Sequence, residues 1–97
     1  MKEDPLPALL EMVRSGANSR VIDRWAIRRL AIMKDERAIP ALAEALALER
    51  LVDEERIEVA AALAWFGKPA AEVLDGEALP AQAAPIVEAA LQLARLR

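Results

Sequence analysis

One segment of the chain is repeated with a step of 33 residues. Residues 29–42 and 62–74 align so that Leu30 matches Leu63, and each segment runs from an apolar stretch through a short turn into a second apolar stretch. Periods of this size are typical of stacked helical hairpins, because a single hairpin cannot bury its own apolar face. The composition agrees, since 56% of the residues are hydrophobic and most of these are the strong helix formers Ala and Leu. We therefore expect an all-α chain.

Glycine residues mark the expected ends of three helices. Gly16, Gly67 and Gly76 each follow an apolar stretch, and glycine adopts the left-handed conformation after a helix without a steric penalty. No segment shows the period of two that is typical of a strand. Connections of two to four residues favour antiparallel packing of successive helices. The expected helices are 5–15, 19–34, 37–50, 53–66, 69–75 and 80–96.

Capping residues mark the expected starts of the first, second and fourth helices. Asp4 followed by Pro5 is typical of an N-cap and the first helical position. Either Asn18 or Ser19 is suited to cap the second helix, because both side chains accept hydrogen bonds from free backbone N–H groups. Asp53 is expected to cap the helix that has acidic residues in its first turn, where they stabilise the helix dipole.

Proline residues mark the starts of the last two helices. Pro69 suits the first turn of the fifth helix. Pro80 and Pro85 both suit the start of the last helix. Because proline disfavours the helical conformation in the residue before it, the regular part of this helix is expected either from Pro80 or from about Ala84.

The repeated segment resembles a known repeat family. Residues 35–42, Asp-Glu-Arg-Ala-Ile-Pro-Ala-Leu, resemble the turn and the second helix of HEAT-like repeats of the phycobilisome-lyase type. Residues 55–63, Glu-Arg-x-x-x-Ala-x-Ala-Leu, are similar to the first helix of that repeat. The first copy departs from the pattern, because Asp23 stands where the repeat usually has Arg and Arg29 where it usually has a small residue. The resemblance covers about residues 20–75.

The resemblance implies a fold more than a function. It implies a short right-handed α-solenoid of the HEAT/armadillo type with about six antiparallel helices, as a single domain over residues 1–97. Its repeats would be 19–50 and 53–75, with flanking helices at 5–15 and 80–96. HEAT-like stacks serve many unrelated roles, so the fold alone does not select one. Some members of the family are bilin lyases, which makes a bilin-lyase-type accessory role one alternative.

The charges are polarised along the chain, although the net charge is only −3. Residues 14–34 contain six basic residues and one acid, whereas residues 44–58 contain six acids and two bases. A net negative charge argues against broad, charge-driven binding of nucleic acid, which usually needs a basic surface. The uneven distribution of charge along the chain instead predicts a local basic surface on the second helix.

Three arginines form that basic surface. Arg20, Arg24 and Arg28 recur at four-residue spacing and therefore share one side of the second helix. One interpretation is a docking surface for an acidic protein, a phosphate or a nucleic acid. The other is a solvated side, or one neutralised by Asp35 and the acids of residues 53–58, because charged stripes on helices are usually solvated.

The two tryptophans allow two interpretations as well. Trp25 continues an apolar stripe with Val21 and Ile32, and Trp65 lies in the apolar run 59–66. Tryptophan often anchors partner proteins at interfaces. Because both residues lie on apolar stripes, we expect them in the core.

The last helix has few polar residues. Among residues 86–96 only Glu88, Gln92 and Arg95 are polar, and they form a narrow stripe. Terminal helices of a stack are expected to be polar on their outer side. Either this helix folds back over the stack or another chain covers it. We expect a two-fold homodimer, with Leu91, Leu93 and Leu96 as candidate contact residues.

The residue types that most enzymes use are missing. The chain has no His, Cys or Tyr, and therefore no imidazole base, thiol nucleophile or soft metal ligand. No glycine-rich phosphate loop is present. We expect no catalytic residue, no metal site and no bound cofactor.

The same sequence predicts a cytoplasmic, non-membrane protein. The longest apolar run has eight residues, whereas a membrane-spanning helix needs about 20. The N-terminal residues lack the basic and then apolar order of a signal peptide. The expected function is a non-catalytic protein–protein interaction or scaffold module that self-associates. Binding of nucleic acid or phosphate through the arginines is the alternative, ahead of the bilin-lyase-type role.

Overall fold

Six α-helices and two short 3₁₀ turns make up the described part of the chain. The structure is a computed structural model, and it describes residues 4–18, 24–48, 51–76 and 79–96. The 3₁₀ turns, Glu36–Ala38 and Ala81–Ala83, precede the third and the sixth helix. Each expected helix has a counterpart in the structure, and none of the described residues forms a strand. The helices are α1 Leu6–Asn18, α2 Arg24–Met33, α3 Ile39–Leu46, α4 Asp53–Phe66, α5 Lys68–Asp75 and α6 Ala84–Leu96.

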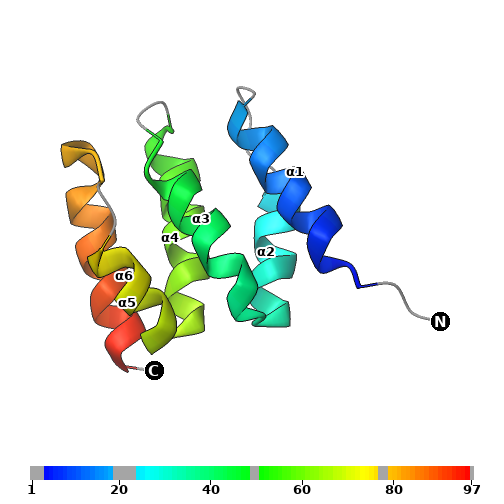
Figure 1. Ribbon diagram of the computed structural model, residues 1–97. Helices are drawn as coiled ribbons and strands as arrows, with labels where there is room; N and C mark the ends of the chain where they lie inside the picture. The colour runs from blue at the N-terminus through cyan, green and yellow to red at the C-terminus, as the bar shows by residue number, and fades with distance from the viewer. Residues whose placement is uncertain (1–3, 19–23, 49–50, 77–78, 97) are drawn as a thin grey trace.

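The helices pack in two layers (Figure 1). In one layer α4 lies between α2 and α6, and in the other α3 lies between α1 and α5. Across the layers α1 packs on α2, α3 on α4, and α5 on α6. The molecule measures 43 × 31 × 20 Å. Because a helix with its side chains is about 10 Å across, the shortest dimension corresponds to two layers of helices.

The core lies between the two layers. Leu30 of α2 and Leu63 of α4, which the 33-residue step aligns, are both fully buried there. Leu42 of α3 and Leu74 of α5, which also align, are buried as well. Many of the remaining core residues are alanines, so helix backbones can approach closely and large side chains are needed at few positions.

One charged side chain is buried in the described part of this core, Arg56 of α4. Its Nη1 donates to the carbonyl oxygen of Leu46 at 2.6 Å, and its Nη2 donates to those of Leu48 at 3.0 Å and Leu51 at 3.1 Å. Leu46 is the last residue of α3, and the final carbonyls of a helix have no partner within the helix. Arg56 therefore joins the end of α3 and the chain that follows it to α4.

Most of the expected helix starts are confirmed. Asp4 accepts a hydrogen bond on Oδ1 from the backbone N–H of Leu6 at 3.0 Å, as expected of a cap. Pro69 lies in the first turn of α5. The last helix begins at Ala84, the later of the two expected starts, because the proline at position 85 fits the first turn of α6. Ser19 lies outside the described residues, as does the beginning of the second expected helix.

Three local expectations are wrong. Asp53 is the first helical residue and not the cap, a position that Val52 takes while the side chain of Glu55 accepts from its N–H at 3.4 Å. Gly16 does not end the first helix, because α1 continues to Asn18, and glycine is only moderately unfavourable inside a helix. Asn18 belongs to α1, and the start of the helix that it was expected to cap lies outside the described residues. Gly76 follows the last residue of α5, as expected, but its φ −94° and ψ −2° are an ordinary right-handed conformation and not the left-handed one.

The turn between α4 and α5 needs a glycine. Gly67 has φ 80° and ψ −143°, a conformation that other residues rarely adopt. Lys34, which the 33-residue step aligns with Gly67, also has a positive φ, 51°. It follows directly on the last residue of α2. Both turns therefore leave their helices through a residue with a positive φ, a glycine in one turn and a lysine in the other.

Replacing Gly67 with alanine is expected to lower the free energy of unfolding by about 1–3 kcal/mol, because alanine would be held in an unfavourable backbone conformation. The matched control is Gly76→Ala, whose added Cβ would lie 3.8 Å from the carbonyl oxygen of Val73, an ordinary contact. This control is expected to be neutral or up to about 1 kcal/mol stabilising. Urea unfolding monitored by circular dichroism measures both free energies of unfolding. Equal effects of the two changes would contradict the requirement for glycine at position 67.

Candidate interaction surface

The exposed large apolar side chains gather on one layer of the structure. In the described ranges, each of them belongs to α2, α4 or α6, or directly precedes α4. Exposed apolar side chains that cluster in this way mark interaction sites more often than scattered ones do. We call the outer side of this layer the α2/α4/α6 face. Its exposed apolar residues are Trp25, Ile32, Val52, Ile57, Trp65, Leu93 and Leu96.

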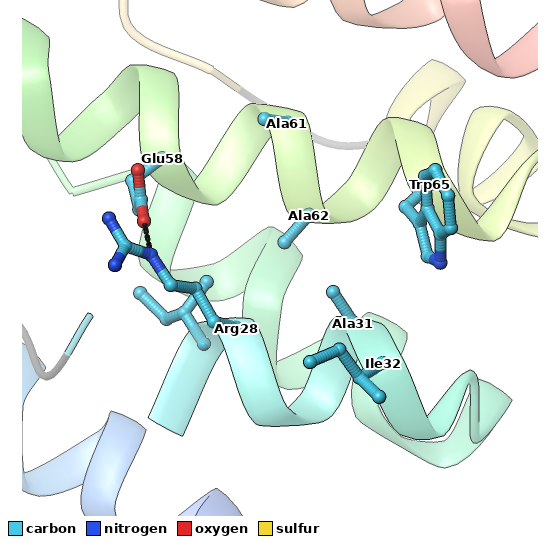
Figure 2. A pocket seen from close by; sticks show the side chains of 8 residues that line it. Arg28, Ala31, Ile32, Glu58, Ala61, Ala62 and Trp65 are labelled. Atoms are coloured by element: carbon cyan, nitrogen blue, oxygen red, sulfur yellow. Dashed lines mark hydrogen bonds and ion pairs between the residues drawn. The ribbon is translucent and has the colours of Figure 1, made fainter. Parts of the chain in front are cut away.

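A first groove on this face lies between α2 and α4 (Figure 2). Its volume is about 350 Å³. Arg28 of α2 and Glu58 of α4 form an ion pair across one end, and Trp65 stands at the other end. Between these ends the lining is apolar. The α2/α4 groove is lined by Ile27, Arg28, Ala31, Ile32, Glu58, Ala61, Ala62 and Trp65.

A second groove lies between α4 and α6, with a volume of about 310 Å³. Ala61 borders both grooves, so the two run on either side of the same exposed part of α4. None of the described residues that line this second groove is charged. The α4/α6 groove is lined by Ile57, Ala60, Ala61, Ala64, Pro85, Ile86, Ala89, Ala90 and Leu93.

The expected arginine stripe is paired with acids where the structure describes it. Arg24 lies 3.5 Å from the carboxylate of Glu54, and Arg28 donates through Nε to Glu58. The interpretation in which acids of residues 53–58 neutralise the stripe therefore accounts for both arginines. Arg20 lies outside the described residues. Exposed ion pairs of this kind contribute little stability, and an anionic ligand would have to compete with the two glutamates.

Asp35 does not take part in neutralising the stripe. Its carboxylate accepts hydrogen bonds from the guanidinium of Arg37, the shortest at 2.6 Å, and from the backbone N–H of that residue at 3.0 Å. These hydrogen bonds hold the pKa of Asp35 below its ordinary value. Asp35 thus caps the 3₁₀ turn that precedes α3.

Both tryptophans are exposed, so the expectation that they lie in the core is wrong. Trp25 is 59% exposed and Trp65 is 43% exposed. The core side of α2 is formed by other residues, among them Ile27 and Leu30, whereas Trp25 and Ile32 face outward. Each ring carries a cation over it: Arg29 lies 5.9 Å from the centre of the Trp25 ring, and Lys34 lies 5.4 Å from that of Trp65.

The three candidate leucines of the last helix do not share one side. Leu91 is only 8% exposed and belongs to the core, whereas Leu93 is 57% and Leu96 is 83% exposed. At 3.6 residues per turn, positions 91 and 93 lie about 200° apart around the helix axis. Only Leu93 and Leu96 are therefore accessible to a partner, and Leu93 lines the α4/α6 groove.

Residue types do not indicate the exposed side of α4 beyond Glu58, because no polar residue marks it there. Residues 59–66 are all apolar, yet Ala61 and Trp65 are exposed while Val59 and Leu63 are buried. The four-residue spacing of Ile57, Ala61 and Trp65, with Glu54 and Glu58 on the same side, is the signal that could have indicated a common outer side.

Comparison with protein-family models, with curated proteins and with solved structures finds no match for this chain. In the described residues no helix is long and apolar enough to cross a membrane. The same part of the chain contains no group of three or more acidic residues placed to hold a metal ion. The function is therefore indicated only by the chain's own surfaces.

Proposed function

We propose that this chain is a non-catalytic protein–protein interaction module, a short right-handed α-solenoid of HEAT-like repeats that forms a homodimer. The observation that carries the proposal is the concentration of exposed apolar side chains and two apolar grooves on the α2/α4/α6 face. The repeat architecture is supported by the buried pair Leu30 and Leu63 and by the positive φ at both Lys34 and Gly67.

The α4/α6 groove is the proposed dimer contact. Its lining is apolar throughout, and its alanines leave room for a large side chain of a second molecule. Leu93 borders this groove and is itself exposed, so two copies related by a two-fold axis could each offer a leucine to the groove of the other. A stable interface buries about 800 Å² on each partner. The broad side of the molecule, which measures 43 × 31 Å, is large enough for an interface of this size.

Nucleic-acid or phosphate binding remains the alternative function, with less support. Arg24 and Arg28 are already paired with glutamates, and the full chain has a net negative charge. The bilin-lyase-type role is supported only by the resemblance, and failure to bind any bilin would remove it. We place the protein in the cytoplasm, which agrees with a chain that has no cysteine to form disulfides.

Sedimentation equilibrium tests the dimer. We expect the natural chain to be a dimer at high micromolar concentration, and Leu93→Glu to raise the dimer dissociation constant by about 30-fold or more, as for a central contact residue. Ile32→Glu places the same charge at another exposed apolar position, in the α2/α4 groove. This control is expected to leave the dimer intact. A natural chain that stays monomeric at several hundred micromolar would contradict self-association.

A further inference from the structure

The α2 side of the α2/α4 groove carries unpaired positive charge. α2 contains three arginines and no acidic residue, and Lys34 directly follows it. Across the groove, Glu54 and Glu58 pair with Arg24 and Arg28. Among the described residues no carboxylate lies within ion-pair distance of Arg29 or Lys34. Arg29 on the exposed side of α2 and Lys34 beside Trp65 therefore carry positive charges that the described carboxylates do not pair with.

These two cations lie over aromatic rings. Lys34 lies above Trp65, which lines the groove, and Arg29 lies above Trp25 on the same exposed side of α2. A cation over an exposed ring gains only about 0.5–1 kcal/mol, so it remains able to meet a carboxylate of a partner. The groove thus combines an apolar floor with positive charge along one edge.

The shape of the α2/α4 groove suits the side chains of a helix. Ala31 and Ala62 leave space between the two helices, and Ile32 and Trp65 rise beside it. α4 has 14 residues and is therefore about 21 Å long. An amphipathic helix that lies in such a groove inserts the apolar residues of one face, at positions i, i+3 or i+4, and i+7.

We propose that the α2/α4 groove binds an amphipathic helix of a partner protein, with apolar residues in the groove and acidic residues beside Arg29 and Lys34. The inference rests on the proposed function, because it names the partner of that interaction module. It assigns this groove to a second protein and leaves the α4/α6 groove to the dimer. Nucleic acid fits the site less well, since the groove itself is apolar and two of the four cations are already paired.

Trp65 provides the signal for a test. The chain has two tryptophans and no tyrosine, so Trp25→Phe leaves Trp65 as the main fluorophore. The probes are two amphipathic peptides of about 18 residues, long enough to cover α4 when helical. Both carry leucine on one face, and their polar flanks are glutamate in one and lysine in the other. An acidic peptide with the same composition in a non-amphipathic order is the negative control.

The acidic amphipathic peptide is expected to shift the Trp65 emission to shorter wavelength and to bind about three- to tenfold more tightly than the basic one, as two exposed charge pairs would give. Reversing both charges, with Arg29→Glu and Lys34→Glu, is expected to invert this preference. Ile32→Glu is expected to abolish binding of the acidic peptide, whereas Leu93→Glu is expected to leave it unchanged.

Equal binding of the two amphipathic peptides, binding of the non-amphipathic control, or acidic-peptide binding that survives Ile32→Glu would overturn the inference. So would the absence of any peptide binding. Sedimentation of the same variants reports the dimer separately: Leu93→Glu acts on the dimer and Ile32→Glu on the peptide. A failure of the peptide site is therefore distinguishable from a failure of the proposed self-association.

Discussion

Replacing Arg56 with methionine is expected to lower the free energy of unfolding by about 3–5 kcal/mol, because it removes three hydrogen bonds from a charged donor to main-chain carbonyls. The carbonyl of Leu46 is fully buried, and those of Leu48 and Leu51 are partly buried. Each would be left without this donor. One contribution acts in the opposite direction, since the buried Nε of Arg56 has no hydrogen-bond partner among the described residues and would be removed as well.

Such a loss is large for a chain of this size, because small domains are stable by only about 5–15 kcal/mol. Urea unfolding monitored by circular dichroism measures it.

Arg56→Lys keeps the charge but has a single nitrogen, which cannot reach all three carbonyls in the geometry of the guanidinium, so about half of the loss is expected. Arg24→Met is the matched control, since it removes an exposed arginine with one ion pair and is expected to change stability by less than about 1 kcal/mol. A loss at Arg56 no larger than at Arg24 would contradict the role of the buried guanidinium.

The second large effect is expected at Leu63. Leu63→Ala removes a fully buried side chain from α4, the helix that packs against α2, α3, α5 and α6. Core substitutions of this kind lower stability by about 2.7–5 kcal/mol, through lost burial and the cavity left behind. The expected loss lies near the upper end, because helices surround α4 on several sides and restrict collapse around the cavity.

Leu30→Ala and Leu93→Ala are the comparisons for this measurement. Leu30 is equally buried and occupies the position that the 33-residue step aligns with Leu63, so a loss in the same range is expected. Leu93 is mostly exposed, and its replacement is expected to change the stability of the monomer by less than about 0.5 kcal/mol, when unfolding is measured at a concentration low enough to dissociate the dimer. If the slope of the unfolding free energy against urea concentration is the same in all three variants, the change in the midpoint urea concentration gives the loss of stability in each. A loss below about 1 kcal/mol at Leu63 would show that this core is not packed as the structure describes.

The ends of the helices could be predicted because local residues determine them. Gly67, Pro69 and Pro85 act through their own backbone geometry, and each marks the boundary that the sequence indicates. Gly76 and Asp53 show where local rules fail. Gly76 shows that a glycine after a helix can adopt a right-handed conformation as well as a left-handed one. Asp53 shows that an acid is favourable at the first helical position as well as at the cap, because both lie near the positive end of the helix dipole.

The sides of the helices could be predicted only in part, because burial depends on neighbours far along the chain. The pairing of the arginines with the acids of residues 53–58 was one of two open interpretations, and Arg24 and Arg28 follow it. The exposure of Trp25 and Trp65 could not be read from apolar stripes, since α2 and α4 are apolar on more sides than their neighbours cover. The burial of Arg56 depends on carbonyl groups from a different stretch of the chain, which no local pattern of residues indicates.

The two turns with positive φ have a consequence for how the chain could grow. Lys34 and Gly67 each directly follow the last residue of a helix, α2 and α4, and each has a positive φ. Residues 34–66 begin just after one of these helix ends and finish at the other, and they contain α3 and α4, one helix of each layer. A tandem duplication of this segment would therefore join the end of α4 to a second copy of the turn at Lys34 and lengthen both layers by one helix, about 8–10 Å. The chain contains in one stretch the whole unit from which a longer array could arise by duplication.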